Sequence, residues 1–207
     1  MHPLVAKLLR GLKKDRDLPV STRVGKVVRS GAALVNARLI LRACDEVGAR
    51  ARSFGRPRIE NRGRITIGED FALAATFGTV ELATAPGGSI EIGNGVTINY
   101  GTAISARRHV KIGHRVNIGP FCIVSDSELP LPLDGGPEDV VSAIEIGDDV
   151  WLAGHVTLLP GARIGAGTVI AAGSVVSGVV PAHAVASGIP ARVLHVSNIP
   201  THVESHG

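Results

Sequence analysis

Aliphatic residues return at every sixth position over long stretches of this chain. Beginning at Ile146, six consecutive hexads fit without a gap. Two shorter sets of three, which begin at Ile92 and Ile112, are separated by a two-residue slip at Arg107 and Arg108. The inward series after Ile146 is Leu152, Leu158, Ile164, Ile170 and Val176, and a second series of small or apolar residues is Val150, Val156, Ala162, Thr168, Ser174 and Val180.

A sustained period of six fits neither an α-helix, with a period near 3.6, nor an isolated strand, with a period of 2. It is typical of a parallel β-solenoid in which each hexad forms a short strand and a corner, and three hexads close one triangular coil. Gly93, Gly113, Gly147 and Gly165 each follow an inward aliphatic residue, where the corner must turn tightly or reach positive φ. A β-sandwich would instead show strands at a spacing of 8–12 residues.

The composition agrees with a core built from small and β-branched side chains. Aromatic residues make up 3% of the 207 residues, whereas 26 are glycine. Cys44 and Cys122 lie far apart and lack the spacing of metal ligands, so we expect reduced thiols, a cytoplasmic protein and no bound metal. No apolar run is long enough for a membrane-spanning helix, and no secretory signal is present at the N-terminus.

The period breaks between Val124 and Ile146. Residues 125–143 are rich in proline, glycine and acidic residues, so we expect a loop extruded from one corner of the solenoid. A loop of this length in a compact fold usually has a function or lacks order. We therefore divide the chain into a basic N-terminal region (1–56), a β-helix domain (57–195) and a C-terminal tail (196–207).

The N-terminal region has the amphipathic pattern of helices at Val5–Lys14 and Gly31–Val47. It holds 13 of the 22 Lys and Arg residues but only 4 of the 18 Asp and Glu residues. The helices either cap the first coil of the solenoid or rest on the anionic inner face of a membrane. Nucleic-acid binding is disfavoured, because the solenoid lacks a basic stripe with interleaved aromatic residues.

Ile144–Leu194 contains VW, LPG, IGAG and GIPARV in that order, after INYGTAISA at 98–106 and IGPFC at 118–122. This stretch resembles the hexapeptide-repeat acyltransferases, and in particular their sugar and polysaccharide O-acetyltransferase branch. The resemblance implies a left-handed parallel β-helix, a homotrimer and acyl-CoA bound in clefts between subunits. It also implies transfer of an acetyl group from acetyl-CoA to a hydroxyl or amine of a sugar or glycan acceptor.

The family's loop histidine is absent from this chain. Similar enzymes carry it in a segment like D-x-D-x-H, whereas this loop reads Asp126, Ser127, Glu128, Leu129 and Pro130. Losing a general base removes about 10²–10⁴-fold in rate, because positioning and oxyanion stabilisation survive. The chain is therefore either an acyltransferase with another base or a non-catalytic β-helix that serves as a structural or regulatory partner.

The substitute bases are Asp126 and Glu128 in the loop and His155 at a corner, which the spacing puts one coil beyond Asn99. A surface corner residue is the alternative for His155. Asn99 matches the asparagine that supports the tetrahedral intermediate in related enzymes, or it is a corner residue that tolerates positive φ.

The resemblance also assigns the acyl-CoA contacts. Gly154, Ala172 and Ser177 match positions along the pantetheine arm, and Arg192 matches a residue that meets the nucleotide phosphates. Trp151 is either a wall of this site or a packing residue of the fold. Relatives often carry lysine after the Ser177 position, where this chain has Gly178.

Overall fold

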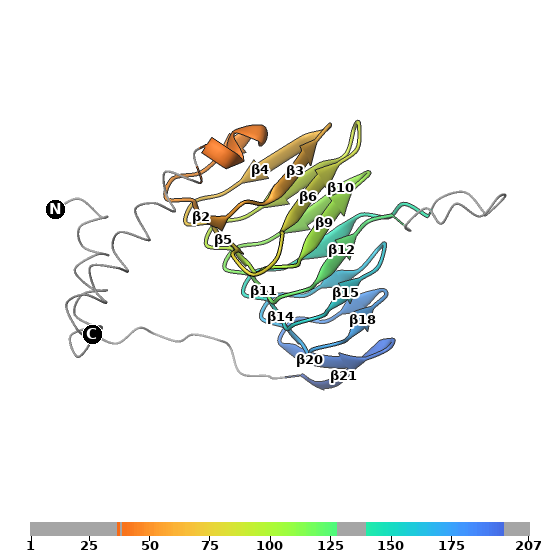
Figure 1. Cartoon of the computed structure of the whole chain (residues 1–207). Helices are drawn as coiled ribbons and strands as arrows, with labels where there is room; N and C mark the ends of the chain where they lie inside the picture. Colours follow the sequence, from red (N-terminus) through yellow and green to blue (C-terminus); the bar gives the residue numbers. More distant parts are fainter. Residues whose placement is uncertain (1–36, 38, 128–139, 197–207) are drawn as a thin grey trace, which may run out of the picture.

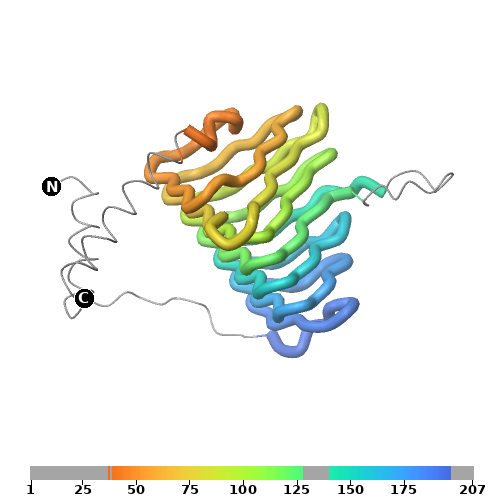
Figure 2. Tube along the Cα trace, in the orientation of Figure 1, coloured from red at the N-terminus to blue at the C-terminus, as the bar shows by residue number. Residues whose placement is uncertain are grey.

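The computed structural model describes residues 37, 39–127 and 140–196. Its strands stack into a triangular prism with three sheets, which we call A, B and C and which are parallel except for one antiparallel pair at the C-terminal end of sheet B (Figure 1). Each of the first six coils contributes one strand to each sheet. The coils follow one another in chain order along the prism, from the orange end to the blue end in Figure 2. The predicted left-handed parallel β-helix is confirmed.

The strands are short and their order within each sheet follows the chain. Sheet A consists of β1 (Glu46–Val47), β4 (Arg64–Ile67), β7 (Ser89–Ile92), β10 (His109–Ile112), β13 (Ile144–Ile146), β16 (Arg163–Ile164) and β19 (Val179–Val180). Sheet B consists of β2 (Arg52–Gly55), β5 (Ala72–Ala75), β8 (Thr97–Ile98), β11 (Asn117–Ile118), β14 (Trp151–Leu152), β17 (Val169–Ile170), β20 (Ala184–Gly188) and β21 (Ala191–Val196). Sheet C consists of β3 (Arg58–Asn61), β6 (Glu81–Thr84), β9 (Ala103–Ala106), β12 (Ile123–Ser125), β15 (Thr157–Leu158) and β18 (Val175–Val176).

The hexad positions form the core. Ile146, Leu152, Leu158, Ile164 and Ile170 are at most 3% exposed and belong to one continuous hydrophobic cluster. Ladder register places like residues above one another, so that Ile118, Leu152 and Ile170 align in sheet B. Burying such a column stabilises the fold by about 1.5–3 kcal/mol for each aliphatic side chain.

One part of the predicted hexad series is wrong. Val180 was expected to continue the second series, but β19 pairs with β16 so that Val180 lies beside Ile164 of the inward series. The corner before β19 is therefore two residues shorter than the corresponding corner between β15 and β16, and the register of the last coil follows this shortening.

The corner glycines are required by close packing between coils. A Cβ on Gly93 would lie 2.6 Å from the carbonyl oxygen of Gly113, and a Cβ on Gly113 would lie 2.8 Å from the backbone nitrogen of Asp148. Neither residue has positive φ. Of the two reasons expected for these glycines, the tight turn holds and the positive φ does not.

The solenoid begins earlier than residue 57. β1 pairs with β4 and β2 pairs with β5, so both strands already belong to the first coil. The helix predicted over Gly31–Val47 is present at residues 37, 39 and 40, and η1 (Leu41–Ala43) continues it as a 3-10 turn. The prediction is wrong at its C-terminal end, because Glu46–Val47 is a strand. The helix predicted at Val5–Lys14 lies outside the described residues.

The segment before β1 contacts the open end of the first coil. Ala37 and Leu41 are 1% exposed and join the core cluster. The Asn61 side chain donates a hydrogen bond to the carbonyl oxygen of Ala43 at 3.0 Å. Figure 1 shows η1 at this end of the prism. These contacts favour the capping interpretation for this part of the N-terminal region. No helix in the described ranges is both long and apolar enough to span a membrane.

Both ends of the predicted loop lie at a single corner of the solenoid, as expected, and this corner is the one between sheets C and A. β12 belongs to sheet C and β13 to sheet A, and an antiparallel bridge between Ser127 and Val141 closes the base of the loop. Ser125 still lies in β12, so the loop starts one residue later than predicted. The body of the loop, 128–139, lies outside the described residues.

Both cysteines are buried thiols. Burial, with a smaller contribution from Asp45, raises the pKa of Cys44 to about 11, and burial also raises the pKa of Cys122. Since the thiolate is the reactive form, neither cysteine of the folded protein should react rapidly with Ellman's reagent at pH 8. We expect both thiols to titrate at once in denaturant. A rapidly reacting thiol in the native protein would contradict this burial.

Candidate functional site

The corner between sheets B and C, which we call the B/C corner, brings four predicted site residues to one edge of the prism. In three coils this corner holds predicted site residues: Asn99 after β8, Gly154 and His155 after β14, and Ala172 after β17. Inter-coil hydrogen bonds fix the stacking: the backbone N–H of His155 donates to Pro120, and that of Gly173 donates to Gly154. The repeat thus gathers residues that are 73 positions apart in the chain, from Asn99 to Ala172.

His155 is exposed at the outermost position of this corner. Its φ of 61° is left-handed, a conformation in which histidine is enriched among non-glycine residues. The imidazole stacks on the Phe121 ring, with centroids 5.0 Å apart and an interplanar angle of 19°. The side chain is therefore held in place by the neighbouring coil while it remains open to a ligand.

The prediction that His155 lies one coil beyond Asn99 is wrong. β8, β11 and β14 are successive strands of sheet B, so two coils separate these residues. At about 4.8 Å for each strand spacing, their backbones are about 10 Å apart along the axis. The coil of Phe121 lies between them.

Asn99 already makes contacts within the solenoid. Its Nδ2 donates to the carbonyl oxygen of Ile118 at 2.8 Å and lies 3.5 Å from Oδ1 of Asn117. The second contact is long, which leaves one N–H able to donate to a ligand. Asn99 does not have positive φ, so that structural alternative is wrong; Gly101, with φ of 70°, takes the left-handed position of this corner.

Asp126 is a fully buried corner cap. Its Oδ1 accepts a hydrogen bond from the backbone N–H of Arg107 at 2.7 Å. Its Oδ2 accepts from the backbone N–H groups of Arg108 at 2.7 Å and His109 at 2.8 Å. These bonds satisfy the backbone N–H groups at the corner where the repeat slips by two residues, at Arg107 and Arg108. Because three donors occupy the carboxylate, it is poorly placed to take a proton from a substrate. Glu128 lies outside the described residues.

The predicted cofactor contacts lie on two corners and a sheet. Gly154 and Ala172 stack on the B/C corner, whereas Ser177 is exposed at the other end of β18. Neither φ nor crowding requires glycine at position 154, because a Cβ there would meet nothing closer than Pro120, at 3.5 Å. Trp151 is 51% exposed on the outer face of sheet B, so it does not pack in the core.

Arg192 lies one strand beyond the last coil, next to the continuation of the B/C corner at Ser187. It is exposed on β21, which returns antiparallel along β20 and pairs Arg192 with Ser187. Its Nη1 donates to the carbonyl oxygen of Ala191 at 3.1 Å. The guanidinium therefore lies at the C-terminal end of sheet B, where the last coil ends.

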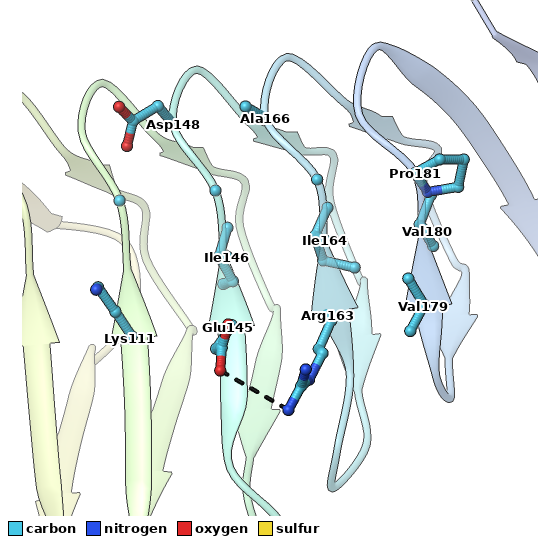
Figure 3. A pocket seen from close by; sticks show the side chains of 13 residues that line it. Lys111, Glu145, Ile146, Asp148, Arg163, Ile164, Ala166, Val179, Val180 and Pro181 are labelled. Carbon is cyan, nitrogen blue, oxygen red and sulfur yellow. Dashed lines mark ion pairs between the residues drawn. The ribbon is translucent and has the colours of Figure 1, made fainter.

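A pocket of about 480 Å³ opens on a different face of the molecule. It lies along β10, β13, β16 and β19 of sheet A and reaches the corner between sheets A and B (Figure 3). Its charged side chains include Lys111, Glu145 and Arg163, and the last two approach to 3.9 Å. None of the predicted site residues in the described ranges lines this pocket. These ranges also hold no group of three or more His, Cys, Asp or Glu placed to bind a metal ion.

A set of aromatic side chains at the B/C corner was not predicted from the sequence. Phe77, Tyr100 and Phe121 occupy this corner in three successive coils and lead to His155. The signal was available in the sequence: three of the six aromatic residues recur at intervals of 23 and 21 residues, close to the length of one coil.

Comparisons with known proteins agree with this architecture. The bacterial transferase hexapeptide (six repeats) model matches residues 143–178. Galactoside O-acetyltransferase of Escherichia coli K12 is 36% identical over 114 residues, which cover 54% of this chain and 56% of that protein. The chain thus spans little more than half the length of this relative.

A second relative is aligned over more of its length. The putative lipopolysaccharide biosynthesis O-acetyl transferase WbbJ of Escherichia coli K12 is 32% identical over 151 residues, or 68% of this chain and 76% of WbbJ. Among solved structures, AntD, an N-acyltransferase from Bacillus cereus in complex with dTDP and 3-hydroxybutyryl-CoA, superposes with a TM-score of 0.64. It is 19% identical, with 78% of this chain and 87% of AntD covered, and shows the shared fold. The repeat, the coil register and the match to WbbJ together show that this chain belongs to the bacterial hexapeptide-repeat transferase family.

Proposed function

We propose that this protein transfers an acetyl group from acetyl-CoA to a hydroxyl or amine of a sugar-containing acceptor. The observation that carries the proposal is the shared edge of the B/C corner, where His155 lies beside Gly154 and one coil from Ala172. Small residues on one side of His155 suit a thin pantetheine arm. The names of the two relatives, a galactoside and a lipopolysaccharide O-acetyltransferase, support a sugar acceptor.

His155 is the general base in this proposal. Its imidazole takes the proton of the acceptor hydroxyl while the hydroxyl oxygen attacks the carbonyl carbon of the thioester. The tetrahedral intermediate then collapses, the C–S bond breaks, and the coenzyme A sulfur leaves and receives the proton. The Asn99 N–H that makes only the long contact to Asn117 binds the acceptor on the far side of Phe121. Asp126 acts through the fold, because its carboxylate is committed to the corner at Arg107–His109.

The chemistry of the described residues fits acyl-CoA. Gly154 and Ala172 leave room along the corner, and the exposed Ser177 and Arg192 supply a hydroxyl and a cation for the polar parts of the cofactor. AntD, which shares the fold, is in complex with 3-hydroxybutyryl-CoA, and this supports the proposal that the present protein binds an acyl-CoA. We further propose that the protein is a cytoplasmic homotrimer with the cofactor in the cleft between subunits, and that its basic N-terminal region gives weak contact with an anionic membrane.

Calorimetric titration of the full chain with acetyl-CoA tests the proposal. We expect saturable binding by the wild type and none by Ala172→Trp, because an indole at this exposed corner would fill the path of the pantetheine arm. Ala182→Trp is the matched control, since Ala182 is an exposed corner alanine between sheets A and B. Absence of binding to the folded wild type, with acetyl-CoA and with longer acyl-CoAs, would leave the non-catalytic role instead.

A further inference from the structure

The aromatic column of the B/C corner consists of Phe77, Tyr100 and Phe121, and it ends on the imidazole of His155. The Phe77 and Tyr100 ring centroids are 5.8 Å apart with an interplanar angle of 77°, and those of Tyr100 and Phe121 are 5.4 Å apart at 90°. Phe121 then stacks on His155 at 5.0 Å. The column runs along four successive coils on the side of His155 opposite to Ala172.

The column is open to solvent. Phe77 is 83% exposed and Phe121 is 46% exposed, in a chain that has only six aromatic residues. A contiguous exposed apolar surface on a soluble protein usually marks a binding site. The core of the prism is filled by aliphatic side chains and Phe71, and the three rings at this corner lie outside it.

Local backbone geometry holds the rings in this arrangement. Gly101 has φ of 70°, and a Cβ at this position would lie 2.3 Å from Cδ1 of Phe121. The Phe121 ring can lie back over the preceding coil only because this residue is glycine. In the next coil His155 takes the same corner position and stacks on Phe121 in turn.

Neutral hydrogen-bonding side chains lie beside the column, and the charged Arg58 and Glu81, which flank its Phe77 end, approach each other to 3.9 Å. Asn117 and Thr79 are exposed, and the amide of Asn99 keeps one N–H able to donate. Flat apolar rings flanked by amides and a hydroxyl complement a sugar ring, whose C–H face packs on an aromatic side chain while its hydroxyls bond to polar groups. This arrangement suits an uncharged sugar better than an anionic one.

We propose that the column is the acceptor platform of this enzyme and that the acceptor is an uncharged oligosaccharide. Its acetylated sugar stacks on Phe121 with the reacting hydroxyl at His155, and the following sugars lie along Tyr100 and Phe77. The proposal rests on the acetyltransferase function proposed above. It explains why the rings and the small residues share one corner, with His155 at the boundary between them.

Acceptor length provides the test. Transfer from acetyl-CoA is measured with the methyl β-glycosides of galactose, glucose and N-acetylglucosamine, and with their β-1,4-linked tetrasaccharides. Phe121→Ala should raise KM about tenfold for single-ring and four-ring acceptors alike, whereas Phe77→Ala should do so only for the tetrasaccharide. Phe77→Tyr should have the wild-type KM for the tetrasaccharide, and the Kd for acetyl-CoA should be the same in all three phenylalanine variants as in the wild type. Val179→Ala, at a residue 75% exposed on sheet A, is the control.

The outcomes separate this inference from the function on which it rests. Calorimetry with each tetrasaccharide is repeated without acetyl-CoA, so that loss of tetrasaccharide binding in Phe77→Ala supports the platform even if acetyl-CoA does not bind. The platform is overturned if no sugar binds while acetyl-CoA does, or if Phe77→Ala has the same effect at both acceptor lengths. It is also overturned if the phenylalanine variants change the oligomeric state in sedimentation with KM unaltered, because the column would then join copies of the chain.

Discussion

Replacement of His155 by asparagine should lower kcat for acetyl transfer by about 10²–10⁴-fold, the range typical for loss of a general base. Asparagine tolerates the left-handed φ of 61° at this position, so the corner should keep its conformation. The amide cannot take the proton of the acceptor hydroxyl. The measurement is steady-state kinetics with acetyl-CoA and the best acceptor of the sugar panel.

His195→Asn is the control for His155→Asn, because His195 is an exposed histidine on β21, away from the B/C corner. The Kd for acetyl-CoA should be unchanged in both variants. A His155→Asn enzyme with the wild-type kcat would show that another residue is the base, and attention would return to Glu128 in the loop.

Replacement of Asp126 by alanine should destabilise the fold by about 3 kcal/mol, since it leaves three part-buried backbone donors unsatisfied at about 1 kcal/mol each, the low end of the cost for a buried donor. The three donors are the backbone N–H groups of Arg107, Arg108 and His109. For a chain of this size that loss corresponds to a fall in Tm of roughly 6–12 °C. Thermal unfolding followed by circular dichroism measures it.

Asp148→Ala is the matched control for the loss of Asp126. The Asp148 carboxylate also caps a corner, but among the described residues it accepts one backbone hydrogen bond, from His114 at 2.8 Å. Its removal should therefore cost less than removal of Asp126. If Asp126→Ala fails to fold, Asp126→Asn retains one acceptor and gives an intermediate Tm. A variant at Asp126 with the wild-type Tm and a greatly reduced kcat would restore Asp126 as a catalytic candidate.

The hexad period was sufficient to predict the solenoid, because a buried residue at every sixth position has few other structural solutions. The cap of Asp126 could not be predicted in the same way. The slip at Arg107–Arg108 and the break after Val124 were both visible in the sequence, but only the ladder between β9 and β12 shows that they lie on the same corner in adjacent coils.

The sequence by itself determined the coil, the core and the family features of this protein, since each depends on local spacing and residue type. The tertiary structure decided which residues share an edge. Residues that pair between adjacent coils are 16 to 34 positions apart in the sequence, because some corners are longer than others. These differences in length add up along the prism. For this reason the spacing of two coils from Asn99 to His155, the three-donor cap of Asp126 and the aromatic column became visible only when the coils were stacked.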